Sequence, residues 1–167
     1  MAFSIRDASV PIYKRGLKNL DAILVKAEAH AASHALDMSV LLNARLAPDM
    51  FNLTKQVQIA SDHAKGGVAR LAGVEIPKFE DNETTVAELR ARIAKTLEFV
   101  NSVDAAKFDG AEKRDIVLKF PWATYEFTGD KFLTYWSLPN FFFHLTTAYD
   151  ILRANGVPLG KADFLGS

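Results

Sequence analysis

The sequence predicts an all-α protein, a four-helix bundle that carries one small β-hairpin between its third and fourth long helices. Four long segments repeat apolar residues at spacings of three and four, which is the pattern of amphipathic helices. One short stretch, residues 115–128, changes to the alternation that is typical of strands. The length of 167 residues suits one ordinary domain, so we expect a single domain over residues 1–167. Long helices joined in this way favour a bundle.

The first long helix is expected within residues 4–35. Pro11 constrains where it begins, because proline has no backbone N–H and clashes with the preceding turn of a helix. The helix therefore either begins near Ser9, with Pro11 in its first turn, or is kinked at Pro11. A short helical piece is expected over residues 39–47, stopped by Pro48.

The second and third helices have the clearest signals. The second has an unbroken apolar seam for packing against neighbouring helices, formed by Met50, Leu53, Val57, Ala60, Ala64, Val68 and Leu71. Gly73 is expected to end it, and residues 73–83 form a loop without any period. Thr85 and Glu88 then make a capping-box pattern, which predicts the start of the third helix.

The hairpin is expected to pair residues 115–120 with residues 124–128 through a turn at residues 121–123. Two strands alone are marginal in water, so this hairpin must pack against the helices. The last helix is expected from residues 128–130 to Asn155-Gly156. Pro139 lies inside it and predicts a kink or two consecutive helical segments.

Composition excludes several classes of function. Lys and Arg number 20, as do Asp and Glu, so the chain has no net charge with which to bind nucleic acid or anionic lipid non-specifically. It has no cysteine, which excludes disulfides, thiolate nucleophiles and cysteine zinc sites. No signal peptide and no apolar run near the roughly 18 residues of a membrane span are recognised. We therefore expect a cytoplasmic protein without nucleic-acid or membrane partners.

Polar residues border the apolar seams of two helices. On a wheel of about 100° per residue, Gln56 and His63 share one stripe of the second long helix, whereas Gln58 lies on the opposite, solvated side. Asn140 and His144 form a similar stripe on the last helix. If the two stripes face each other, these residues surround one polar pocket, as ligand sites in bundles commonly do. The sequence thus predicts a ligand pocket lined by Gln56, His63, Asn140 and His144.

Each of these signals also has a structural interpretation. His144 can be a histidine at the edge of the core whose hydrogen bonds are all made within the protein. The side-chain amides of Gln56 and Asn140 can link neighbouring helices by hydrogen bonds. His30 and His34 have the i, i+4 spacing of a zinc site, but they lie at the C-terminal end of a helix, where the dipole favours histidine. Trp136 and Phe143 are expected to point away from the main apolar stripe and to form a homodimer interface; the alternative is packing against the first helix or the hairpin.

Three segments carry a resemblance to a known family. They are Leu-Asn-Ala-Arg-Leu-Ala-Pro-Asp-Met-Phe at residues 42–51, Pro-Asn-Phe-Phe-Phe-His-Leu-Thr-Thr-Ala-Tyr at residues 139–149, and Asn-Gly-Val-Pro-Leu-Gly-Lys at residues 155–161. With them the chain resembles one branch, a domain family of unknown function, of the DinB/YfiT-like metalloenzyme superfamily. The resemblance covers essentially the whole chain. It implies a DinB-like up-and-down four-helix bundle, often a homodimer, and no particular substrate.

The wider superfamily implies three histidines around a divalent metal, one from the second helix and an H-x-x-x-H pair from the last. By position, His144 matches the second histidine of that pair and Asn140 replaces the first. Gln56 is closest to the place of the remaining histidine, and His63 follows two turns later. Neutral amides bind zinc, nickel or copper more weakly than imidazole does, so the resemblance implies a degenerate metal site.

Three functions follow from these observations. The first is binding of a small molecule in the polar pocket, with no cofactor. The second is a hydrolase or thiol transferase that uses a divalent metal, Zn or Ni, held by His144. The third is a purely structural homodimer. Whether the protein is an enzyme stays open on the sequence.

Overall fold

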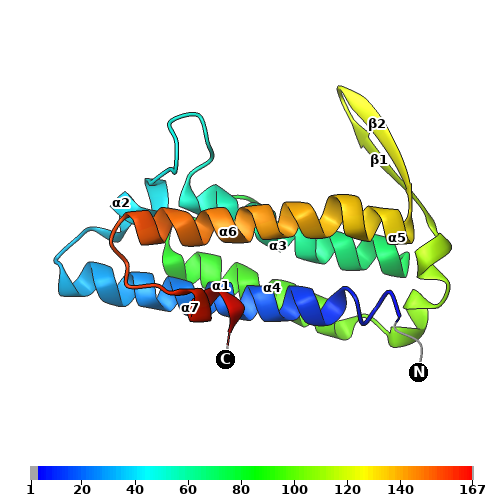
Figure 1. Cartoon of the computed structure of the whole chain (residues 1–167), viewed down its shortest axis with the longest axis horizontal. Helices are drawn as coiled ribbons and strands as arrows, with labels where there is room; N and C mark the ends of the chain where they lie inside the picture. Colours follow the sequence, from blue (N-terminus) through cyan, green and yellow to red (C-terminus); the bar gives the residue numbers. More distant parts are fainter. Residues whose placement is uncertain (1–3, 167) are drawn as a thin grey trace.

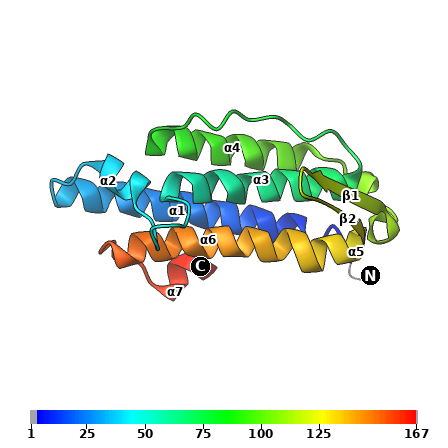
Figure 2. The ribbon, with the colours of Figure 1, turned by 90° about the horizontal axis from the view of Figure 1, so that it is seen from above.

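The computed structural model describes residues 4–166, and four long helices dominate it (Figures 1 and 2). These are α1 (Val10–Ser33), α3 (Leu53–Ala72), α4 (Val86–Ser102) and α6 (Leu138–Ala154). The shorter elements are α2 (Met38–Asn43), η1 (Ala105–Phe108), η2 (Ala111–Lys113), β1 (Asp115–Phe120), β2 (Ala123–Thr128), α5 (Gly129–Lys131), η3 (Phe132–Ser137) and α7 (Lys161–Leu165). The predicted helical bundle with a hairpin between its third and fourth long helices is confirmed. None of the helices in the described part is long and apolar enough to cross a bilayer.

The ends of the long helices follow local signals. α1 begins at Val10 with Pro11 in its first turn, so the first of the two alternatives for Pro11 is confirmed. Gly73 ends α3 in the left-handed conformation, at φ 66°. The capping box that starts α4 is also present: the Glu88 amide N–H donates to Thr85 Oγ1, and the Thr85 amide N–H donates to the Glu88 carboxylate.

The short helix before α3 differs from its prediction. It ends at Asn43, well before Pro48, because the chain then turns so that the Leu53 amide donates to the Ala44 carbonyl at 3.0 Å. The Arg45 guanidinium donates to the Met50 carbonyl at 2.5 Å inside the same turn. Asn52 caps α3, which starts at Leu53 rather than at Met50, because its side-chain oxygen accepts from the Lys55 amide.

The order of the helices in space depends on one long connection. α1 and α3 run in opposite directions, and so do α4 and α6, as in an up-and-down bundle (Figure 2). α3 and α4 run in the same direction, because the chain between them returns along the outer side of α4 (Figure 2). A crossover of this kind is one of the known ways to connect a four-helix bundle. It places residues 73–85 against the long helices instead of leaving them as a free loop.

The last helix is interrupted near Pro139, as expected, but by a widened turn. α5, η3 and α6 follow one another without a break, and η3 is π-helical. Proline cannot donate a backbone hydrogen bond, so the regular α-helical ladder is lost next to Pro139. The extra residue in this turn rotates Phe132–Ser137 relative to α6, by about 100° for one residue. This rotation determines which side chains of Phe132–Ser137 face α3.

The hairpin projects from one end of the bundle (Figure 1). β1 and β2 pair antiparallel with Phe120 opposite Ala123, so only Pro121 and Trp122 form the turn. Ile116 and Leu118 of β1 are buried against the helical part, which gives the hairpin the support that two strands need.

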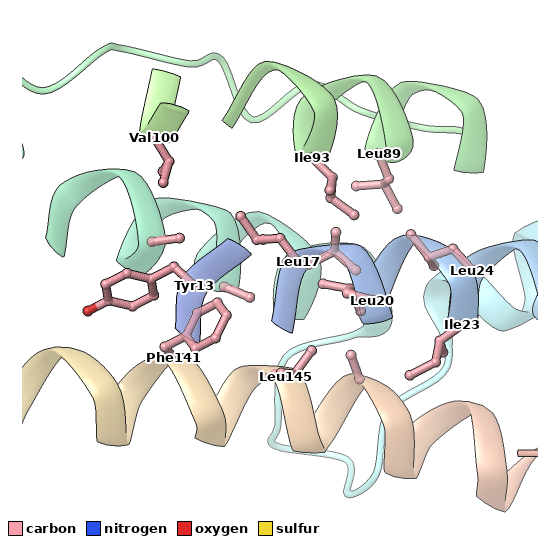
Figure 3. Packing of buried hydrophobic residues seen from close by; sticks show 14 of the residues in the cluster. Tyr13, Leu17, Leu20, Ile23, Leu24, Leu89, Ile93, Val100, Phe141 and Leu145 are labelled. Atoms are coloured by element: carbon pink, nitrogen blue, oxygen red, sulfur yellow. The ribbon is translucent and has the colours of Figure 1, made fainter. Parts of the chain in front are cut away.

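The core lies where α1 meets α4 on one side and α6 on the other (Figure 3). Leu17 and Leu20 of α1 are fully buried. Tyr13 meets Phe141 of α6 edge to face, with 5.1 Å between the ring centroids. The helices approach closely at Gly16, where a Cβ atom would lie 2.7 Å from the Phe141 ring. This close packing of α1 on α6 fixes the position of α6, which carries His144 and Asn140.

Candidate polar site between α3, α6 and the hairpin

Gln56 of α3 and His144 of α6 form a part-buried hydrogen bond between their two helices. The Gln56 side chain is 1% exposed, and its amide nitrogen donates to the Phe51 carbonyl at 3.1 Å. Its oxygen is therefore the atom that meets His144 Nδ1, at 2.7 Å. Since a carbonyl oxygen only accepts, Nδ1 carries the proton and Nε2 keeps its lone pair. Gln56 thus fixes both the orientation and the tautomer of the His144 ring.

His63 lies against the ring of His144. The ring centroids are 5.8 Å apart and the planes are inclined by only 13°. Burial lowers the pKa of His144 to about 4. Burial, together with the nearby His144 and Arg70, lowers the pKa of His63 to about 4 as well. Both imidazoles are therefore neutral at pH 7, and each can donate one hydrogen bond and accept another.

A cavity of about 260 Å³ adjoins His63. Four parts of the chain line it: α3, β1, η3 and the start of α6. Its polar lining residues are Asp62, His63, Arg70, Ser137 and Asn140, and its apolar ones are Gly67, Leu118, Phe120, Phe132 and Trp136. A few polar groups within mainly apolar walls are the usual make-up of a small-molecule site.

The four side chains predicted for the pocket lie in one region but not in one lining. His63 and Asn140 line the cavity, whereas Gln56 and His144 are not among its lining residues; His144 stacks on His63 and Gln56 bonds to His144. Asn140 turns its amide nitrogen back to the Trp136 carbonyl of its own helix, at 2.7 Å. The two stripes therefore meet, but a helical wheel cannot tell a side chain that lines a cavity from one that lies behind the lining.

Two charged residues of the cavity were not among the predicted ones. Arg70 follows His63 after two turns, on the same stripe of α3, so the wheel that selected His63 would also have found Arg70. Asp62 precedes His63, and its carboxylate is engaged with Lys65 and Arg92, each at 2.7 Å. The site therefore contains charges as well as the neutral amides and imidazoles.

Gln58 was expected to be solvated, and this is wrong. Its side chain is buried, and the amide nitrogen donates to the Glu83 carboxylate at 2.8 Å. The cause is the crossover between α3 and α4, which folds back over both helices. Arg92 of α4 holds this crossover in place through ion pairs with Glu83 at 2.9 Å and with Asp81 at 3.0 Å. The periodicity of α3 alone does not reveal this cover.

The metal that the superfamily resemblance implies does not fit the side chains present. Within residues 4–166, no group of three or more His, Asp or Glu side chains is placed to hold an ion. One nitrogen of His144 is taken by Gln56, and the Asn140 amide bonds to its own helix. His30 and His34 lie with ring centroids 4.2 Å apart, at the end of α1, and belong to no such group.

Trp136 and Phe143 have different surroundings. Trp136 packs against the hairpin, with ring centroids 5.0 Å from Tyr125 and 5.9 Å from both Phe120 and Phe127. Phe143 is 55% exposed on α6. The wide turn of η3 separates them in phase, so they do not share one face as the uninterrupted wheel predicted. The homodimer itself stays a prediction.

Comparisons with known proteins agree with this architecture. A family model described as a domain of unknown function (DUF1993) matches residues 5–165. No curated protein matches the chain. A crystal structure described as a DinB family member protein from Shewanella denitrificans has 50% sequence identity and a TM-score of 0.90. The match covers 97% of this chain and 92% of that one, so the predicted DinB-like fold is confirmed. The chain belongs to the DUF1993 family.

Proposed function

We propose that this protein binds a small molecule in the cavity between α3, η3 and β1. The observation that carries this proposal is the cavity itself, whose lining combines the polar side chains of His63, Arg70 and Asn140 with the rings of Phe120 and Trp136. Its volume of about 260 Å³ is just below the usual range of about 300–1,000 Å³ for ligand sites, so it suits a small ligand.

Gln56 and His144 act as positioning residues in this proposal. The Gln56 amide holds His144, and the His144 ring supports one face of His63. His63 is thereby held beside the cavity as a neutral imidazole, ready to exchange hydrogen bonds with a polar ligand. A site whose groups are already in place loses less conformational entropy on binding.

Tryptophan fluorescence offers a direct test. The chain has two tryptophans: Trp136 lines the cavity, and Trp122, at the tip of the hairpin, is 76% exposed. The Trp122→Phe variant leaves Trp136 as the single reporter. We expect small polar compounds from a panel to change its emission in a saturable way and to raise the melting temperature.

Two variants and a control make this test specific. Asn140→Leu and His63→Phe should abolish the response, because each removes a polar group from the lining. His30→Phe changes a histidine at the end of α1 that is not part of the lining, and it should leave the response unchanged. If no compound of the panel changes the emission, or if both cavity variants respond like the parent, the proposal is wrong.

Two other functions remain to be weighed. A metal-dependent hydrolase or thiol transferase using His144 needs further ligands, and the described residues offer no group of three. A purely structural homodimer needs an apolar surface, for which exposed Phe143 is one candidate. The cavity favours ligand binding over both.

A further inference from the structure

Arg70 is a half-buried cation that lacks an acidic partner among the described residues. Its only hydrogen bond there runs from Nη1 to the Gly66 carbonyl of its own helix, at 3.2 Å, and none of the ion pairs between residues 4 and 166 includes it. Arg92, by contrast, is paired with three carboxylates. Burying a charge without a counter-charge is costly, and an arginine always keeps its charge. Arg70 therefore lines the cavity as a cation without a counter-ion.

The remaining charge at the cavity is already balanced. Asp62 is held by Lys65 and Arg92, both at 2.7 Å, and His63 is neutral at pH 7. Arg70 is thus left as one uncompensated positive charge. One such charge suits a singly charged anion, because a second negative charge on the ligand would meet the Asp62 carboxylate without a further cation to offset it. The planar guanidinium matches a carboxylate group in particular, through two parallel hydrogen bonds.

The aromatic lining residues of the cavity indicate what kind of group the rest of the ligand carries. Phe120 of β1 and Phe132 and Trp136 of η3 add aromatic surface to a lining to which α3 contributes His63 and Arg70. Aromatic rings prefer offset-stacked or edge-to-face contacts with another ring and also cover apolar groups well. A ligand that uses both sides of this small cavity has one charged end and one compact apolar end.

We propose that the cavity binds a small monocarboxylate with an aromatic or apolar body, whose carboxylate pairs with Arg70 and whose body packs against Phe120 and Trp136. This inference rests on the proposed function, since it names the class of ligand for the same cavity. It assigns Arg70 a binding role that follows from its position and its lack of a partner.

Three probes of nearly the same shape test this assignment: phenylacetate, phenylacetamide and 2-phenylethylamine, which is a cation at pH 7. Each is titrated into the Trp122→Phe variant while the emission of Trp136 is followed. We expect phenylacetate to bind about tenfold tighter than the amide, or more, because hydrogen bonds to charged groups are the stronger ones. The amine should bind weakest.

Two arginine variants locate the effect. Arg70→Met keeps the apolar stem and removes the charge, and it should reduce phenylacetate binding to the level of the amide. Arg153→Met removes the same charge from an exposed position near the end of α6, outside the cavity lining, and should keep the preference. Far-UV circular dichroism checks that both variants fold. The comparison of the three probes on the Trp122→Phe protein, in which both arginines are unchanged, does not depend on how the arginine variants fold.

The outcomes separate this inference from the proposed function. Equal binding of the acid and the amide, a preference for the amine, or an unchanged preference in folded Arg70→Met would overturn the carboxylate assignment and leave the pocket intact. Binding of other compounds of the panel, with none of the three probes bound, would do the same. If nothing at all binds in the cavity, both proposals fall together.

Discussion

Replacing Arg92 by methionine should loosen the crossover between α3 and α4. Arg92 is 2% exposed and donates from Nη1 to Glu83 at 2.9 Å and to the Glu80 carbonyl at 3.1 Å. Its Nη2 atom pairs with Asp62 at 2.7 Å and with Asp81 at 3.0 Å. Methionine fills much of the same volume but can make none of these contacts.

The expected cost comes mainly from Glu83. Its side chain is only 10% exposed, so the variant leaves a buried carboxylate without its cation, for which losses of about 3–5 kcal/mol are typical. Asp62 and Asp81 are each more than a third exposed, and such screened pairs add little. Gln58 still donates to Glu83, which favours the lower end of that range. We therefore expect a loss of about 3 kcal/mol in the free energy of unfolding.

Urea unfolding followed by far-UV circular dichroism measures this loss as a lower midpoint at an unchanged slope. Arg90→Met is the matched control: Arg90 lies on the same helix and pairs with Asp21 at 2.8 Å, but both side chains are more than a third exposed, so removal of this pair should have little effect. Adding Glu83→Gln to Arg92→Met should restore part of the stability. If Arg92→Met costs no more than Arg90→Met, the crossover is not fastened in this way.

The other predictions concern protons, metal and assembly. Because His63 and His144 have a pKa of about 4 when folded and near 6.5 when unfolded, stability should be constant above pH 7. The free energy of unfolding should then fall by about 2 kcal/mol as the pH is lowered from 7 to 5, a figure that allows for solvent screening. The reason is that both histidines take up protons in the unfolded chain before they do so in the folded one. Urea unfolding of the parent and of His144→Leu measures this, and an equal fall in the variant would contradict it. Elemental analysis of protein purified without chelators should find no stoichiometric zinc or nickel; a full equivalent that is lost in His144→Ala would instead support the metal-dependent alternative. If the chain forms a homodimer through α6, Phe143→Ala should yield monomers by light scattering, while Thr146→Ala, at an exposed position on the same helix, should not; a dimer in both would exclude Phe143 as an anchor.

The bundle could be predicted because its long helices carry local signals. Pro11 in the first turn of α1, Gly73 after α3 and the Thr85–Glu88 capping box each act within a few residues. Apolar spacing supplies the rest, since a seam such as that of α3 has no other place to be buried. Such features do not depend on which segments meet later in folding.

Contacts between segments that lie far apart in the chain could not be predicted from the sequence. The crossover between α3 and α4 has no period, so nothing in its sequence shows that Glu83 returns to cover Gln58. The wide turn before Pro139 also changes the phase of Trp136, which moves its ring to the hairpin. The helical wheel placed Gln56 and His144 beside the apolar seams of their helices. The hydrogen bond between them and the stacking of His144 on His63 depend on distances between helices, which the wheel does not give.

Gln56 holds His144 as a neutral ring with its proton on Nδ1, behind a neutral His63. Long-range ¹H–¹⁵N spectra of the histidine rings, recorded at pH 7 on the parent and on Gln56→Leu, report this tautomer. We expect one neutral Nδ1–H tautomer for His144 in the parent and a mixture of tautomers once the amide is gone. A charged His144 at pH 7, or a proton on Nε2 in the parent, would contradict it.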